Sequence, residues 1–293
     1  MHIIIDKYSV TMTKLIISDL WFEDSIESDS LAKLTKDIIV KPILSLNKGV
    51  TEIKITHAGT DLDPAFEVVQ WLGYNYPALI YHHGNNERPF DYGKTSKNTF
   101  KTILYPYLSS IQGNIITIRA PFHAGTLKKF TSKMRNLSNF TSMIAASTNL
   151  VEQLVQNLKN NNSPKITIIG LSLGGWVTNL HRSMYNSANQ YIPIFAGAAL
   201  DRIFVDSYYK KLVYDQALLN RKVLFDALNF EALFNSVTDM NLFPVLAKYD
   251  QNIQYEQQKT CYSNFPIVLL KKGHITGALD SKSLFKHILN HIQ

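Results

Sequence analysis

The sequence contains a single cysteine, Cys261, among its 293 residues. One cysteine excludes an intramolecular disulfide and a cysteine-rich metal site, and it fits a reducing compartment. No apolar run reaches the roughly 20 residues that cross a bilayer. Asp6 and Lys7 interrupt the first stretch, where a secretory signal needs an apolar core. We therefore expect a soluble, cytoplasmic protein without stable membrane insertion.

Charged side chains are also sparse, at 18% of the chain, whereas hydrophobic residues make up 45%. This is the composition of a globular protein with a large core. The formal net charge is +7, but the lysines are spread along the chain and do not gather in one stretch with interleaved aromatic residues. We interpret them as a solvated basic surface and expect no nucleic-acid partner. The oligomeric state has no signature in the sequence.

Short apolar runs alternate with helix-length amphipathic segments from residue 77 onward. The runs are apolar almost throughout, which is typical of strands buried on both faces of a parallel sheet. They lie at residues 77–83, 114–122, 165–170, 191–200, 243–250 and 265–273. Helices are predicted at 97–111, 139–160, 173–188, 252–263 and 281–292. This alternation predicts a doubly wound α/β fold, mostly parallel, with helices on both faces and a ligand site at the C-terminal ends of the strands.

Two segments depart from this alternation. Within residues 1–75, the runs at 14–22 and 49–59 are strand-like, 29–46 is helical in pattern, and 64–73 suits a short helix or an extended arm. Antiparallel strands from this segment could extend the sheet.

Residues 201–242 separate two predicted strands by more chain than one crossover helix needs, and they are rich in Tyr, Phe and Leu. We expect this segment to be a helical cap inserted into a core of residues 1–200 and 243–293. A pair of crossover helices that cover the sheet is the alternative.

The stretch Ile169-Gly-Leu-Ser-Leu-Gly174 places Ser172 between a predicted buried strand and a predicted helix. A serine at such a junction, with a glycine two positions away on either side, is the context of a nucleophile elbow. Gly170 and Gly174 are expected because no Cβ fits into so tight a turn. The N–H groups at the start of the helix would face an anion on the reacting carbon, which makes Leu173 the first oxyanion donor.

On these residues, together with a His83-Gly84 loop and an acid and a histidine that follow in order, the chain resembles the α/β-hydrolase superfamily over residues 77–293. The resemblance implies an eight-stranded, mostly parallel sheet and a Ser, Asp, His triad in that chain order. It implies the base at His274, after the last predicted strand. The acid is implied at Asp250, at the end of the preceding strand, with Asp201 as the alternative, since some lipase-like relatives carry the acid one strand earlier.

The second oxyanion donor is expected in the loop after the strand at 77–83. The N–H of Asn85 is the first choice, with Gly84 and Asn86 as alternatives, because the loop lacks the three-glycine form found in many esterases. His83 is expected to anchor this loop.

The stretch Arg119-Ala-Pro-Phe-His-Ala-Gly125 should reach the same rim. Either Phe122 or His123 lines the mouth of the pocket there, or the stretch is a rigid turn with Phe122 packed inward.

Together these residues predict a serine hydrolase of the carboxylesterase or lipase-like type. It would cleave small esters with an apolar acyl or aryl group through an acyl-enzyme on Ser172. The mechanism needs no cofactor and no metal. Thioesterase, acyltransferase, lactonase and peptidase activities use the same triad and stay open as alternatives, as does a non-catalytic binding protein of the same fold.

Overall fold

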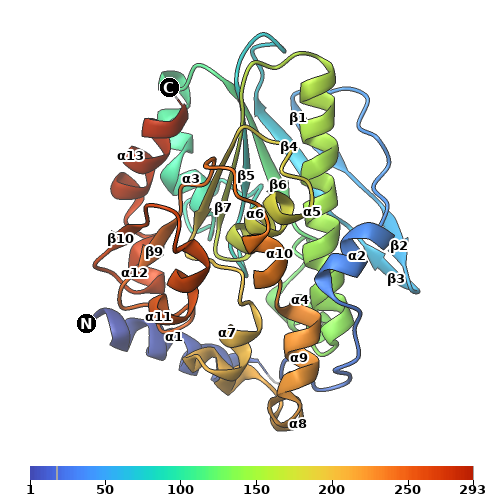
Figure 1. Ribbon diagram of the computed structural model, residues 1–293, viewed down its shortest axis with the longest axis vertical. Coiled ribbons are helices and arrows are strands. Elements are labelled where there is room, and N and C mark those ends of the chain that lie inside the picture. The colour runs from blue at the N-terminus through green and yellow to red at the C-terminus, as the bar shows by residue number, and fades with distance from the viewer. Residues whose placement is uncertain (18, 293) are drawn as a thin grey trace.

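The computed structural model describes residues 1–17 and 19–292. Eight strands form one sheet in the order β1, β4, β6, β5, β7, β8, β9, β10 (Figure 1). Their bounds are β1 (Gly49–Glu52), β4 (Ala65–Gln70), β6 (Asn114–Arg119), β5 (Ala78–His82), β7 (Ile166–Leu171), β8 (Gln190–Ile194), β9 (Val245–Ala247) and β10 (Val268–Leu270). The strands β6, β5, β7, β8, β9 and β10 are all parallel to their neighbours in the sheet. Strand β4 pairs antiparallel with both β1 and β6. The predicted fold class is confirmed.

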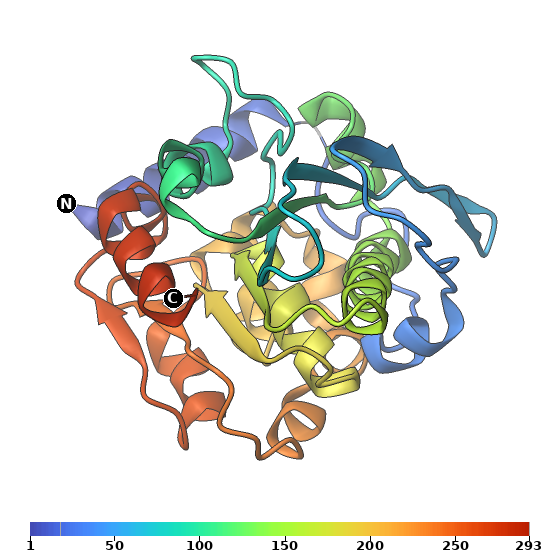
Figure 2. The same ribbon diagram turned by 90° about the horizontal axis from the view of Figure 1, so that it is seen from above.

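Strand β5 shows why its apolar run predicted a sheet buried on both faces. Ala78 and Ile80 belong to one core cluster, and Leu79 and Tyr81 belong to the other. Successive side chains of a strand point to opposite faces, so both faces must be covered. Helices α5 (Leu137–Asn160) and α6 (Leu173–Met184) cover one face, and α3 (Thr99–Ile103) and α13 (Ser281–Ile292) cover the other (Figure 2).

The first residues form a helix and not the strand expected at 14–22. Helix α1 (His2–Ile16) includes the start of that stretch, and residue 18 lies outside the described residues. Asp6 and Val10 are the buried residues of α1, and they are four residues apart, on one side of the helix. Beyond α1, Trp21 makes only an isolated bridge with Val213. The prediction of a strand here is wrong because the buried positions follow a helical period.

The helix predicted over 29–46 is shorter in the structure. Helix α2 (Leu31–Asp37) ends five residues before Pro42, and a helix that continues through Pro42 to residue 46 is disfavoured because proline lacks the N–H and clashes with the preceding turn. Residues 64–73 contain β4, so antiparallel strands do extend the sheet. A separate hairpin consists of β2 (Ile55–His57) and β3 (Thr60–Leu62).

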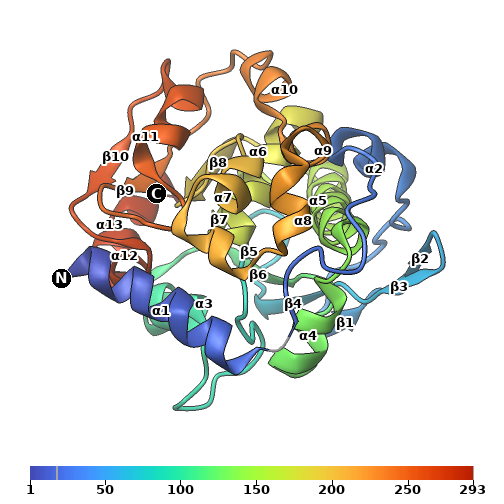
Figure 3. The same cartoon turned by 90° about the horizontal axis from the view of Figure 1, so that it is seen from below.

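Residues 201–242 are helical, as expected, but in five short pieces. These are α7 (Asp201–Val205), η2 (Tyr208–Leu212), α8 (Asp215–Leu219), α9 (Arg221–Leu228) and α10 (Glu231–Asn235). Seen from below, α7 and α8 lie across the ends of the central strands, with α1 and α4 (Leu127–Lys133) beside them (Figure 3). The role of this segment as a cap stays a prediction.

The remaining helices follow the outer strands. They are η1 (Tyr105–Ser110), α11 (Tyr255–Gln258), η3 (Lys259–Tyr262) and α12 (His274–Ala278). Within residues 1–17 and 19–292, every helix is too short or too polar to span a bilayer.

Candidate active site

Ser172 lies in the turn between β7 and α6, in a backbone conformation that few L-residues adopt. Its φ is 54° and its ψ is −108°. The surrounding backbone holds this conformation, because the N–H of Ser172 donates to the carbonyl of Ile194 at 2.8 Å and its own carbonyl accepts from Trp176 at 3.1 Å. A strained turn of this kind, fixed by hydrogen bonds on both sides, is a frequent feature of functional sites.

Close approach of backbone, and not positive φ, explains the two flanking glycines. A Cβ on Gly170 would lie less than 3.0 Å from the carbonyl oxygen of Gly174, and a Cβ on Gly174 would lie equally close to the carbonyl oxygen of His82. Real Cβ atoms do not approach so closely. The N–H of Gly174 also donates to the carbonyl of His83 at 3.0 Å. The turn after β7 therefore packs directly against the loop after β5.

That contact brings two unoccupied N–H donors to the same region. In the part of the chain that the structure describes, neither the N–H of Leu173 nor that of Asn85 makes a hydrogen bond. The N–H of Gly84, by contrast, donates to Oε1 of Glu87 at 3.0 Å. The alternative that Gly84 supplies an oxyanion donor is therefore corrected. The N–H of Asn86 also makes no hydrogen bond among the described residues, so Asn86 stays an alternative to Asn85. Its φ is 62°, a conformation that asparagine tolerates better than most residues.

The half-buried carboxyl of Glu87 is a feature of this loop that the sequence did not reveal. Its Oε2 accepts from the N–H of Thr99 at 2.7 Å and from the Thr99 hydroxyl at 2.8 Å. Burial raises the pKa of Glu87 to about 7, and the hydrogen bonds from Thr99 and Gly84 oppose that rise. Glu87 binds Gly84 and is itself held by Thr99, which lies 12 residues further along the chain, so no local sequence motif marks Glu87.

His83 is buried beneath the loop. Its Nε2 accepts from the N–H of Ala120 at 3.0 Å, so its Nδ1 carries the proton and donates to the carbonyl of Gly84 at 2.6 Å. Burial, together with His123 and His82, lowers the pKa of His83 well below its usual range. A neutral imidazole with both nitrogens engaged suits the expected role as an anchor of the loop.

In the stretch 119–125, Phe122 packs inward, as expected for the alternative of a rigid turn. That residue is 8% exposed, has a φ of 67° and donates its N–H to Oδ1 of Asp63 at 2.7 Å. His123 is also buried, but it borders a surface cavity of about 400 Å³ together with Arg88, Arg119 and Lys129. Ser172 does not line this cavity.

The structure joins His274 to the first of the two candidate acids. Nδ1 of His274 donates to Oδ2 of Asp250 at 2.7 Å. The other oxygen, Oδ1, accepts from the N–H groups of Asn252 at 2.8 Å and Ile253 at 2.7 Å, so Asp250 also caps the turn that follows it. Asp201 has a different partner, because its Oδ1 accepts from Nδ2 of Asn229 at 2.8 Å.

The environment of His274 favours its protonated form. Burial lowers the pKa of His274, but the charge and hydrogen bond of Asp250 and the charge of Asp6 outweigh burial and raise that pKa above its ordinary value. Asp6 comes from α1, and the sequence did not mark it as part of the site.

Phe195 connects His274 with the turn that carries Ser172. It follows Ile194, the residue that accepts the N–H of Ser172, and its ring centroid is 5.8 Å from that of His274. Gly277 of α12 packs against the same ring, since a Cβ there would lie 2.5 Å from Cζ of Phe195. No hydrogen bond joins Ser172 to His274 among the described residues. Such bonds are often long before substrate binds.

The described residues contain no group of three or more His, Cys, Asp or Glu side chains placed to hold a metal ion. The segments after β7, β9, β10 and β5 carry, respectively, a serine, a carboxylate, an imidazole bonded to that carboxylate, and a backbone N–H group without a partner among the described residues.

Comparisons with known proteins place the chain by its fold. No family model and no curated protein matches the sequence. Acylaminoacyl peptidase from Pyrococcus horikoshii has a TM-score of 0.58 at 15% identity over 84% of this chain, which spans 41% of the length of that peptidase. Acetyl xylan esterase 1 from Thermoanaerobacterium sp. JW/SL YS485 has a TM-score of 0.55 at 12% identity, covering 89% of this chain and 96% of the esterase.

Est1E from Butyrivibrio proteoclasticus has a TM-score of 0.52 at 15% identity, covering 82% of this chain and 98% of that protein. Identities this low concern the fold alone. The eight-stranded sheet, the turn after β7 and these structural neighbours together show that the chain has the α/β-hydrolase fold.

Proposed function

We propose that this protein is a serine hydrolase that cleaves carboxylic esters through an acyl-enzyme on Ser172. The hydrogen bond of 2.7 Å between His274 and Asp250 carries the proposal. The two residues follow β10 and β9, while Ser172 follows β7. All three therefore lie at the C-terminal ends of parallel strands, where α/β sheets bind their ligands.

In the first half-reaction, Nε2 of His274 accepts the hydroxyl proton of Ser172 while Oγ attacks the ester carbonyl carbon. Asp250 holds the imidazole by Nδ1 and stabilises the imidazolium that forms. The negative charge on the former carbonyl oxygen is met by the N–H groups of Leu173 and Asn85. When the intermediate collapses, the bond to the alcohol oxygen breaks and His274 gives its proton to the leaving alcohol.

In the second half-reaction, a water molecule takes the place of the alcohol. His274 accepts a proton from this water, whose oxygen attacks the acyl carbon of the ester on Ser172. The same N–H groups meet the second oxyanion. Collapse releases the carboxylic acid and returns the proton to Oγ of Ser172, so one ester and one water give one acid and one alcohol.

The residues beside the second oxyanion donor favour an apolar acyl or aryl group. The hydroxyl of Tyr209 lies 3.4 Å from Nδ2 of Asn85. The Tyr209 ring packs against Trp21 and Phe204, with centroid separations of 5.5 and 6.0 Å. Segment 201–242 thereby brings an aromatic cluster next to the loop after β5, and aromatic and apolar linings are typical of small-molecule sites.

A fluorophosphonate probe tests the assignment of the nucleophile. We expect the intact mass of the wild-type protein to increase by one adduct and that of Ser172→Ala to stay unchanged. Ser236→Ala, at an exposed serine, is the matched control and should be labelled like the wild type. A folded wild-type protein that takes no label, or a Ser172→Ala variant that is labelled equally, contradicts the proposal.

A panel of p-nitrophenyl esters with two to about sixteen acyl carbons would then define the substrate class. An N-acyl amino acid anilide belongs in the same panel, because one structural neighbour is an acylaminoacyl peptidase. Hydrolysis of the esters with little hydrolysis of the anilide is the expected result. The reverse preference would replace the esterase assignment by a peptidase on the same three residues.

A further inference from the structure

Helix α1 carries a carboxylate that is fully buried. Asp6 has 0% of its surface exposed, although aspartate is almost never fully buried unless it is paired. Its partners are three backbone N–H groups. Oδ2 accepts from His274 at 2.8 Å and from Gln251 at 3.1 Å, and Oδ1 accepts from Ile275 at 3.0 Å. Each of the three partners is a donor, so the carboxylate oxygens of Asp6 accept all three bonds.

These three donors belong to the two loops that hold the acid and the base. Gln251 follows Asp250 directly, and the other two donors are His274 itself and the residue after it. One carboxylate therefore connects the loop after β9 to the loop after β10 through backbone bonds. This connection is separate from the side-chain bond between His274 and Asp250.

The loop after β10 is shaped to admit this carboxylate. A Cβ on Gly273 would lie 2.6 Å from Oδ2 of Asp6 and 3.0 Å from its Cγ. The φ of Gly273 is −91°, which any residue can adopt, so the close approach of Asp6 is the reason that position 273 needs glycine.

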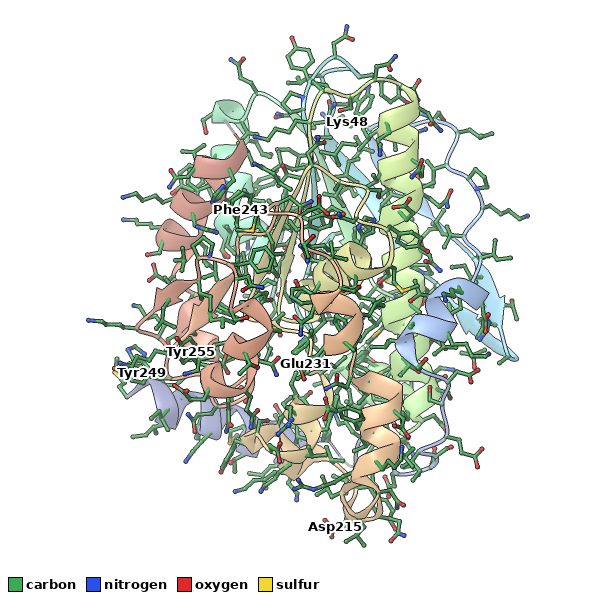
Figure 4. The ribbon with its side chains drawn as sticks, viewed as in Figure 1. Lys48, Asp215, Glu231, Phe243, Tyr249 and Tyr255 are labelled. Carbon is green, nitrogen blue, oxygen red and sulfur yellow. The ribbon has the colours of Figure 1, made fainter. Side chains whose placement is uncertain are left out.

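A second residue of α1 contacts the same two loops. Nδ1 of His2 is 2.9 Å from the hydroxyl of Thr276, and the His2 ring stacks on Tyr249 with a centroid separation of 6.1 Å. Tyr249 lies beside α1 in Figure 4, and Figure 3 shows α1 next to α12. Helix α1 thus contacts the side chains of Tyr249 and Thr276 through His2, in addition to the three backbone N–H groups that Asp6 binds.

We propose that Asp6 is a positioning residue of the hydrolase site, which holds the loops of Asp250 and His274 together and adds a second negative charge beside the imidazole. This inference rests on the proposed function. His274 becomes an imidazolium in each half-reaction, and a nearby negative charge stabilises that form. Asp250 and Asp6 are the charged groups that act on the imidazole of His274. The elements packed beside it also carry His2, which contacts Thr276 and Tyr249, and the pair Lys272 and Asp280, whose side chains are 3.6 Å apart.

The test is Asp6→Asn, which keeps the size of the side chain, removes its charge and replaces one acceptor oxygen by an NH2 donor. We expect kcat/KM for a p-nitrophenyl ester to fall by about tenfold, because misplaced catalytic groups lose rate steeply. We also expect the acidic limb of the pH profile to move to lower pH. The NMR titration of the His274 ring, assigned with His274→Gln, should move in the same direction.

Val10→Ala is the matched control, because Val10 is buried on the same helix and belongs to the main core cluster. It should lower the unfolding temperature while leaving the acidic limb and the His274 titration unchanged. If Asp6→Asn is folded by circular dichroism and moves neither the limb nor the titration, the proposal is overturned. Equal movements in Val10→Ala would also overturn it, since they would show a general effect of loosening α1.

Gly273→Ala provides a second route if Asp6→Asn does not fold. The added Cβ should displace the Asp6 carboxylate and lower kcat, and unchanged kinetics would contradict the positioning role. The NMR titration of His274 needs no turnover, so the proposed esterase function and the proposed role of Asp6 can fail separately. A wild-type protein that neither hydrolyses esters nor takes the probe, but whose His274 titration depends on Asp6, would remove the esterase assignment and leave the influence of Asp6 on His274.

Discussion

The turn that carries Ser172 and the loops that carry Asp250 and His274 are held in place in different ways. In the turn, the closest contacts are between backbone atoms of Gly170, Gly174 and the end of β5. The acid and base loops are held by Asp6, which lies 245 residues before Gln251 and 268 before His274. The first arrangement is steric and made by backbone atoms, and the second is polar and made by one side chain.

Changes at the turn and changes at the acid and base loops should therefore have different effects. A side chain added to the turn has nowhere to go, because backbone atoms surround the position and a packed interior yields little. A changed polar group at the acid and base loops removes charge or a hydrogen bond but leaves the sheet intact. We therefore expect substitutions in the turn to lower the stability of the protein, and substitutions in the two loops to lower its activity.

The largest effect on stability is expected at the turn, from Gly174→Ala. The new Cβ would lie against the carbonyl oxygen of His82, so the free energy of unfolding should fall by about 4 kcal/mol or more. Urea unfolding followed by circular dichroism measures the change. Gly125→Ala is the matched control, because its Cβ would meet only the flexible side chain of Lys129, 3.3 Å away. Similar losses in both variants would refute the steric explanation.

The largest effect on catalysis is expected at the acid, from Asp250→Asn. An amide cannot stabilise the imidazolium or hold the same tautomer, and a corresponding change in a Ser-His-Asp site lowers kcat by about 10⁴. Initial rates with a p-nitrophenyl ester measure it. Asp201→Asn should stay within a few fold of wild type, because Asp201 is bonded to Asn229 and not to His274. A larger loss in Asp201→Asn than in Asp250→Asn would reverse the assignment of the acid.

A smaller effect concerns the pH dependence of the wild-type protein. His274 must be neutral to accept a proton, and its pKa is raised because the charges of Asp250 and Asp6 outweigh burial. Activity should therefore fall on acidification, with the midpoint of kcat/KM above the ordinary histidine value of about 6.5. In Asp250→Asn, the midpoint of the residual activity should move to lower pH. A profile that is flat between pH 5 and 8 would contradict a histidine base.

The smallest effect is expected at the aromatic cluster, from Tyr209→Phe. The variant loses a weak hydrogen bond of 3.4 Å to Asn85 and keeps the ring packing against Trp21, so kcat/KM should change by less than about threefold. Tyr209→Ala removes the ring as well and should raise KM more for aryl and long-chain esters than for acetate. Equal changes for all esters would show that this cluster does not contact the acyl or aryl group.

Much of the sheet and part of the site could be predicted from short stretches of the chain. Strands β5 to β9 were visible because burial on both faces leaves a continuous apolar run, as Ala78 to Tyr81 show. Strand β10 has an apolar run too, although Val268 and Leu269 are each 38% exposed. The elbow was visible because a tight turn excludes Cβ atoms at fixed distances from Ser172. The structure brings together His274 and Asp250, the pair chosen on their places at strand ends.

Other parts of the site could not be predicted because their partners are distant in sequence. Gly84 was expected as a possible donor to the oxyanion, but its N–H is taken by Glu87, which is held in turn by Thr99. The strand predicted at 14–22 is wrong because its first residues belong to α1. The buried positions that mark this helix, Asp6 and Val10, lie outside that stretch.

The sequence alone determined the class of fold and the nucleophile candidate, because apolar periodicity and glycine placement are properties of neighbouring residues. Only the tertiary structure decided how the base is held. Asp6 has no local signature, since a buried carboxylate is stable there only through N–H groups of Gln251, His274 and Ile275, which folding alone brings to it.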